Sequence, residues 1–101
     1  MAEPLPIPSD DWCIGVHVPE LRAGYTLLKW ESTRPPAERV RVREYTCDCQ
    51  PTFYELCQAG GLLFIRRTRR RGREILIDES APTRYAKAMI VWGRLLSGLV
   101  R

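Results

Sequence analysis

The sequence predicts an α+β fold, in which an antiparallel sheet of about five strands carries a long amphipathic C-terminal helix on one face. Three observations lead to this prediction. Apolar segments with strand-like patterning recur between turn signals over residues 12–79. An arginine-rich turn around Gly72 separates two of these segments, which is typical of a β-hairpin. From Ser80 onward, apolar residues recur at helical spacing instead.

The chain of 101 residues is long enough for one domain and too short for two. Residues 1–11 contain Pro4, Pro6 and Pro8, which cannot donate backbone hydrogen bonds to a sheet. We therefore expect a Pro-rich extended arm over residues 1–11 and a single α+β domain over residues 12–101.

Three strands are expected in the first half of the chain. Residues 12–18 alternate apolar and other side chains, and residues 24–33 and 38–49 follow as the second and third strands. In the third strand, Val40 and Val42 lie on the face opposite a row of arginines. One face of the sheet should therefore be in contact with solvent there.

The segment over residues 52–59 allows two interpretations. Thr52 and Glu55 fit a capping box and Gly60 fits a left-handed helix cap, which together favour a short middle helix. The pair Gly60-Gly61 is also a hairpin signal, and it would make the segment an extra strand. The helix is the preferred alternative.

The hairpin around Gly72 is the feature with the most functional content. Residues 62–65 and 75–77 are apolar at consecutive positions, so both strands are expected to be central and buried on both faces. Gly72 tolerates the positive φ of a tight turn. Six arginines lie between the two apolar segments, namely Arg66, Arg67, Arg69, Arg70, Arg71 and Arg73.

The end of the chain predicts a long amphipathic helix that begins near Ser80 and has Pro82 in its first turn. Its apolar stripe consists of Tyr85, Ala88, Met89, Trp92, Leu95, Leu96 and Leu99. Ile90 lies on the opposite, basic side. We interpret Ile90 as an ordinary exposed aliphatic residue, with a homodimer contact as the alternative.

The positive charge of the chain is local. The net charge is +4, but without the six hairpin arginines 10 Lys and Arg remain against 12 Asp and Glu. A basic cluster on a mildly acidic body predicts a field that attracts a polyanion or an acidic partner. Three further candidates for this surface are Arg39, Arg41 and Arg43. A solvated hairpin tip without a partner is the plainer interpretation.

Two functions are compatible with this surface. The first is a small nucleic-acid-binding or regulatory protein in which the hairpin tip contacts phosphates, mostly through the backbone of the nucleic acid. The second is a protein interaction module or accessory subunit that binds an acidic protein surface. No known nucleic-acid-binding motif is present in the sequence.

Metal ligation has weak candidates in Cys47, Cys49, Cys57, Cys13 and His17. Structural zinc sites usually use pairs of ligands separated by two to four residues, whereas Cys47 and Cys49 have one residue between them. In an extended segment they lack the turn that would direct both thiols at one ion. We therefore expect free thiols, with no metal and no cofactor.

Catalytic patterns are weaker still. His17 is the only histidine and is interpreted as structural, and no nucleophile, phosphate-loop or dinucleotide motif accompanies it. We expect a non-enzymatic protein. The sequence has no secretory signal and no apolar run long enough for a membrane span, so we expect a cytoplasmic protein without membrane partners.

Overall fold

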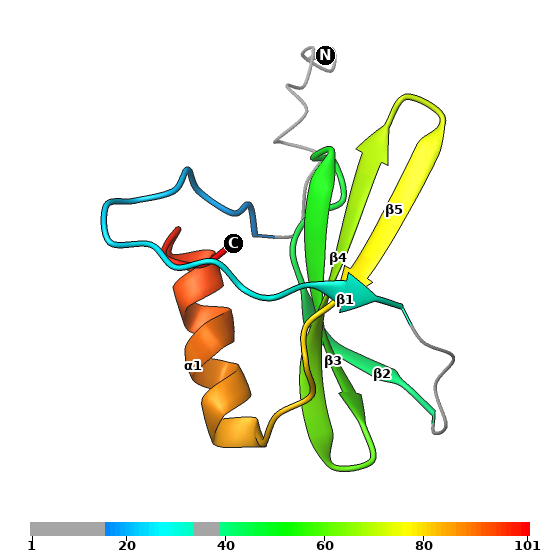
Figure 1. The fold of residues 1–101 in the computed structure, drawn as a ribbon, viewed down its shortest axis with the longest axis vertical. Helices are drawn as coiled ribbons and strands as arrows, with labels where there is room; N and C mark the ends of the chain where they lie inside the picture. The colour runs from blue at the N-terminus through cyan, green and yellow to red at the C-terminus, as the bar shows by residue number, and fades with distance from the viewer. Residues whose placement is uncertain (1–15, 34–38) are drawn as a thin grey trace, which may run out of the picture.

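The computed structural model describes residues 16–33 and 39–101, which form a five-stranded antiparallel sheet and one short helix (Figure 1). The elements are β1 (Glu31–Ser32), β2 (Arg41–Tyr45), β3 (Thr52–Ala59), β4 (Leu62–Arg71), β5 (Glu74–Glu79) and α1 (Tyr85–Leu96). The strand order is β1-β5-β4-β3-β2, so β4 is central and β1 and β2 are the edges. The expected Pro-rich arm lies outside the described residues.

Two glycine turns set the register of the three longest strands. Gly60 and Gly61 have φ values of 59° and 81°, as a two-residue turn with positive φ at both positions requires, and they place Ala59 opposite Leu62. Gly72 has a φ of 60°, and it places Arg71 opposite Glu74. Both turns are tight, so the three strands form one continuous meander.

The preferred helix over residues 52–59 is wrong, because this segment is β3. All eight of its residues pair with β4, from Thr52 opposite Arg69 to Ala59 opposite Leu62. The Gly60-Gly61 turn returns the chain directly along β3, and the threonine and aromatic residues at its start favour a pleated strand. The hairpin signal of Gly60-Gly61 therefore indicated the structure of this segment correctly, and the capping pattern of Thr52 and Glu55 did not.

The first half of the chain contains less strand than expected. Residues 12–15 lie outside the described residues, and Val16 makes only an isolated parallel bridge to Thr46. Within residues 24–33, only β1 pairs with the sheet, and Thr26 bridges to Val100 instead. The third expected strand is shortened to β2, and an irregularity at Arg43 shifts its register against β3. The alternating patterns did not distinguish extended coil from strand.

The long C-terminal helix is also wrong, because α1 has 12 residues. Before it, Thr83 and Leu63 exchange two backbone hydrogen bonds of 2.8 Å, and Ser80 Oγ accepts one from the Ile65 amide. Residues 80–84 are therefore extended against β4. After it, Gly98 adopts a φ of 78°, and Leu99 O and Arg101 N hydrogen-bond to backbone atoms of Thr26. Backbone pairing at both ends limits the helix.

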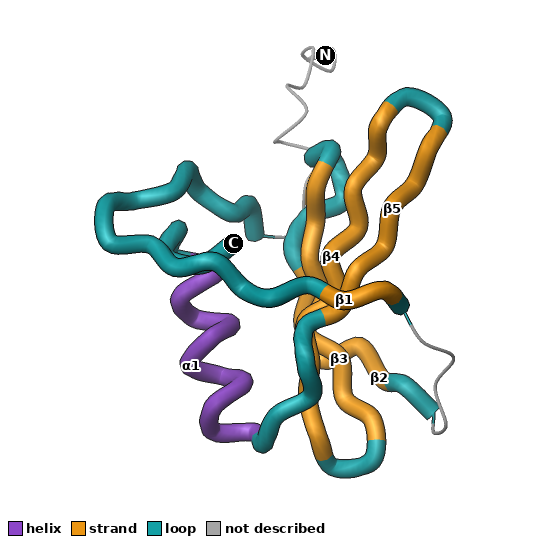
Figure 2. Tube along the Cα trace, viewed as in Figure 1, coloured by secondary structure: helices purple, strands orange, loops and turns teal. Residues whose placement is uncertain are grey.

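The helix packs on one face of the sheet, as Figures 1 and 2 show. Cross-strand partners share a face, so Leu56 and Ile65 lie together and contact the helix side of the core. The buried members of this core are Tyr54, Leu56, Leu63, Ile65, Ala88, Trp92, Leu95 and Val100. We call this side of the sheet the helix face.

The opposite side, which we call the second face, is only partly buried. Cys57 and Phe64 are buried there, but Ile75 and Ile77 of β5 are 64% and 42% exposed. The expectation that both apolar hairpin strands are buried on both faces therefore holds for Leu63, Phe64 and Ile65 of β4, but it fails for Leu62, which is 40% exposed, and for β5. The helix packs on the other face of the sheet, so it does not shield these side chains.

Candidate nucleic-acid interface

The hairpin arginines belong to β4 and to the turn that follows it. Arg66, Arg67, Arg69, Arg70 and Arg71 are strand residues, and Arg73 follows Gly72 in the turn. Successive side chains of a strand point to opposite faces. The strand therefore divides its arginines, with Arg67, Arg69 and Arg71 on the helix face and Arg66 and Arg70 on the second face.

Three of the six arginines are paired with carboxylates of the same sheet. Arg67 and Arg69 each donate a hydrogen bond of 2.8 Å to Oδ2 of Asp78. These hydrogen bonds, with that of Arg67 foremost, lower the pKa of Asp78. Arg66 lies 3.5 Å from Glu55 and 3.6 Å from Glu79. We call Arg66, Arg67 and Arg69 the inner arginines, and their charge is offset within the fold.

An aromatic contact also holds Arg67 in place. Its guanidinium carbon lies 4.3 Å from the centroid of the Trp30 ring, and the Trp30 ring lies 6.2 Å from that of Tyr54. Burial raises the pKa of Tyr54, against the lowering effect of the nearby arginines. Arg67 thus connects the segment before β1 to the sheet through a cation–π contact.

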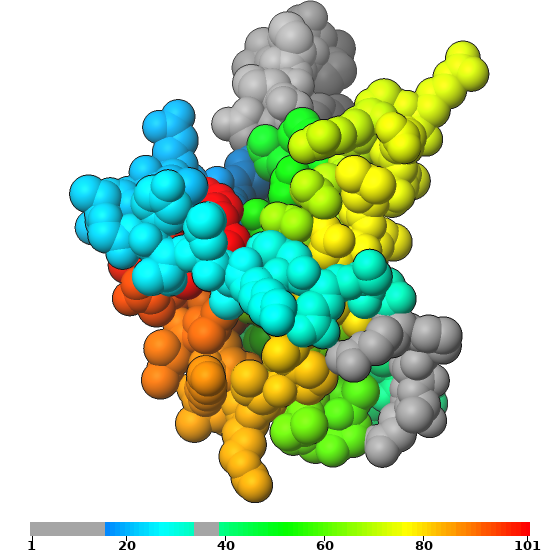
Figure 3. Space-filling model, in the orientation of Figure 1, coloured from blue at the N-terminus to red at the C-terminus, as the bar shows by residue number. Residues whose placement is uncertain are grey.

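The remaining three arginines, Arg70, Arg71 and Arg73, lie at the exposed end of the hairpin, and we call them the tip arginines. The guanidinium carbon of Arg70 lies 5.1 Å from the ring centroid of Phe53. Within the described parts of the chain, none of the three forms an ion pair with a carboxylate. Figure 3 shows the yellow-green end of this hairpin projecting from the body of the molecule.

Arg39, Arg41 and Arg43 do not lie beside the tip. Arg41 is opposite Gln58, and Gln58 is opposite Leu63, near the start of β4. The guanidinium group of Arg43 donates a hydrogen bond to the Gln58 side chain. The tip begins beyond Arg69, six residues further along β4, which corresponds to about 20 Å at the rise of a strand. The structure therefore places these two basic groups at opposite ends of the sheet.

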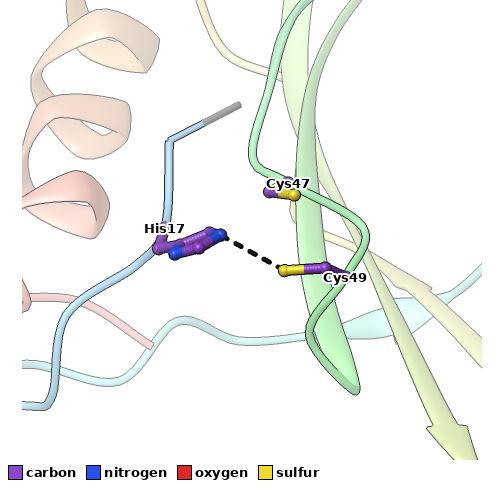
Figure 4. A group of neighbouring side chains, drawn as sticks. All are labelled: His17, Cys47 and Cys49. Carbon is purple, nitrogen blue, oxygen red and sulfur yellow. Dashed lines mark hydrogen bonds between the residues drawn. The ribbon is translucent and has the colours of Figure 1, made fainter. Parts of the chain in front are cut away.

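The candidate metal ligands do not all lie together in the structure. The side chains of His17, Cys47 and Cys49 converge in the loop between β2 and β3 (Figure 4). Cys57 is buried in the middle of β3, where burial raises its pKa to about 11. Cys13 lies outside the described residues.

Sequence reasoning missed the carboxylates that pair with the inner arginines. Asp78 and Glu79 lie at the end of the second apolar segment of the hairpin. Counting outward from the turn, with Arg71 opposite Glu74, places Arg67 opposite Asp78 and Arg66 opposite Glu79. That signal was present in the sequence. Trp30 carried no such signal, because its contact with Arg67 joins segments that do not pair as strands.

Neither a family model, nor a curated protein, nor a solved structure matches this chain. Over residues 16–33 and 39–101, no helix has the length and apolar character needed to cross a bilayer.

Proposed function

We propose that the chain is a small, non-enzymatic, cytoplasmic nucleic-acid-binding protein that contacts phosphates with the tip arginines. The observation that carries the proposal is the division of the hairpin. Its inner arginines are offset by Asp78, Glu55 and Glu79, whereas Arg70, Arg71 and Arg73 have no carboxylate partner among the described residues. Exposed guanidinium groups that are not paired with a carboxylate are available to phosphate oxygens.

The shape of the hairpin supports this use. A two-stranded ribbon can enter a groove of a duplex or lie along a single strand, and the tip is the end of such a ribbon. Gly72 in the turn of the hairpin has no side chain, so the backbone there can approach a ligand closely. The tip has no Asn or Gln, so binding should be directed mostly to the phosphates.

The test is a salt series with two matched triple variants. A fluorescently labelled duplex of mixed sequence is titrated with the wild-type chain, and the affinity is measured by anisotropy at several salt concentrations. Three phosphate contacts give a slope of log affinity against log salt of roughly −3. Replacing the tip, by Arg70→Ser, Arg71→Ser and Arg73→Ser together, should abolish most of this slope. Arg69 is left in place because it pairs with Asp78.

The control variant is Arg39→Ser, Arg41→Ser and Arg43→Ser, which removes the same charge from the other end of the sheet. Circular dichroism shows whether both variants are folded. A loss of binding in the tip variant alone supports the proposal. Absence of binding at low salt contradicts it, and so does an equal loss in both variants, since that would indicate attraction by net charge.

A second candidate function is binding to an acidic protein surface. The observation that favours it is the exposure of Ile75 and Ile77 beside the tip, where Ile75 is the cross-strand partner of Arg70. Apolar side chains next to cations suit the core and rim of a protein interface. In this case Ile75→Ser should weaken capture of the partner as strongly as the tip variant does, while nucleic acid is not bound. A homodimer contact through the exposed Ile90 belongs to the same alternative and is tested by light scattering of Ile90→Glu.

A further inference from the structure

Three side chains with soft donor atoms meet at the loop between β2 and β3. His17 comes from the segment before β1, and Cys47 and Cys49 come from the loop (Figure 4). His17 Nε2 lies 3.2 Å from Cys49 Sγ, and the donor atoms of all three residues lie within 4.8 Å of one another. His17 and Cys49 are 32 residues apart in the chain, so only the fold brings them together.

The backbone holds these donors in place. The Cys47 amide donates a hydrogen bond of 2.8 Å to Val16 O, next to the parallel bridge between Val16 and Thr46. Thr46 in turn exchanges hydrogen bonds with the backbone of Tyr54 at the start of β3, at 2.8 Å and 2.9 Å. The segment that carries His17 and the loop that carries both thiols are therefore fixed to the same part of the sheet.

The loop also removes the objection raised by the spacing of the two cysteines. In an extended strand they would lack the turn that directs both thiols at one ion. Residues 48–49 instead form a turn, the sulfur atom of Cys49 points toward His17 (Figure 4), and the Cys47 sulfur atom lies within 4.8 Å of both of these donor atoms. Thiolate and imidazole ligands at about 2.3 Å and 2.0 Å from a tetrahedral zinc ion are roughly 3.5 Å apart. The distance of 3.2 Å between His17 and Cys49 is close to this value.

We propose that His17, Cys47 and Cys49 bind a zinc ion. Two thiolates and an imidazole are soft or borderline ligands, which favour zinc over the oxygen-preferring cations magnesium and calcium. Over residues 16–33 and 39–101, no other His, Cys, Asp or Glu joins these three. The fourth position of a tetrahedral zinc ion would then be open to water.

The ion would fasten the segment before β1 to the sheet. Near the site, only Val18 of this segment packs against the core, since Val16 is 54% exposed and Pro19 to Thr26 are exposed throughout. Its one bridge to the sheet there is that of Val16. Coordination by groups from both segments would add a cross-link to the contact of Val18 with the core, and metal binding should then be coupled to the order of this segment.

The test uses the full chain, reduced with a phosphine and freed of metal with a chelator, and titrated with Co²⁺ and then Zn²⁺. We expect one equivalent of Co²⁺ to give thiolate-to-cobalt charge-transfer absorption and the strong visible bands of a tetrahedral complex, both lost when Zn²⁺ displaces it. Cys49→Ser and His17→Gln should each weaken zinc binding by more than about 100-fold. Replacing a residue that only hydrogen-bonds to a metal ligand already lowers metal affinity roughly 10- to 100-fold.

Cys49 is exposed and His17 half-buried, so neither replacement should unfold the chain. Asp48→Asn is the matched control, since it changes the charge of the same loop without removing a donor, and it should bind zinc like the wild type. Absence of stoichiometric binding at micromolar protein would overturn the proposal. Unchanged affinity in both ligand variants would do the same. Neither result bears on nucleic-acid binding by the tip.

Discussion

The guanidinium group of Arg67 lies over the indole ring of Trp30, with its carbon 4.3 Å from the ring centroid. The same group donates a hydrogen bond of 2.8 Å to Asp78 on the neighbouring strand. Arg67 therefore has a structural partner on each side, although it belongs to the most basic stretch of the sequence. Charge density in a sequence does not by itself identify the groups that are available to a ligand.

We predict that Arg67→Ala lowers the free energy of unfolding by about 1–3 kcal/mol, because it removes the cation–π contact and leaves Asp78 with one partner fewer. Arg71→Ala is the control, as its exposed side chain should contribute within about 0.5 kcal/mol. Urea unfolding followed by tryptophan fluorescence measures both. Equal effects of the two replacements would contradict the division into inner and tip arginines.

The pKa of Asp78 predicts a dependence of stability on pH. The hydrogen bond from Arg67 lowers this pKa in the folded chain, so on acidification the unfolded chain takes up the proton first. The contribution of Asp78 to stability is then complete above the ordinary aspartate pKa of about 3.9 and is lost as the pH falls through the lower, folded-state value. Asp78→Asn should therefore be less stable than the wild type at pH 7, and the difference should shrink below about pH 4. A constant difference from pH 7 to pH 3 in urea unfolding would refute this assignment.

Glu44 is predicted to stabilise the core from the surface of β2. Its Oε1 accepts a hydrogen bond of 2.9 Å from Nε1 of Trp92, which is 2% exposed. Glu44→Ala would leave the indole N–H unpaired and should cost about 1–3 kcal/mol. Glu44→Gln keeps an acceptor at the same place and should recover most of this loss. If the two variants are equally unstable in thermal unfolding, the hydrogen bond is not the cause.

Two glycines at the end of the chain should respond in opposite ways to alanine. A Cβ at Gly98 would lie 2.4 Å from the carbonyl oxygen of Glu20, and its φ of 78° is unfavourable for other residues. Gly98→Ala should thus destabilise the chain by more than about 1 kcal/mol. Gly93 lies inside α1 with open space around it, so Gly93→Ala should raise stability by about 0.5–1 kcal/mol. Opposite shifts of the unfolding temperature in the two variants would confirm both predictions. An unchanged unfolding temperature in Gly98→Ala would contradict the prediction for Gly98.

Local signals in the sequence were sufficient for part of the architecture. The Gly72 turn carries the glycine that positive φ requires and lies where a hairpin was predicted, whereas the Gly60-Gly61 hairpin was only the less favoured alternative to a helix. Helical spacing located α1 near the end of the chain. Its length did not follow, because the residues on either side of α1 satisfy their backbone groups against Leu63 and Thr26, far away in the sequence.

The sequence by itself determined that a basic hairpin exists and that cysteines flank Asp48. Only the tertiary structure decided that Arg67 and Arg69 share Asp78 while the tip arginines face solvent, and that His17 approaches Cys49 across 32 residues. The physical reason is common to both cases. Patterns of residue type follow from local conformation, whereas the partner of a charge or a thiol depends on strand register and on backbone hydrogen bonds between segments that are distant along the chain.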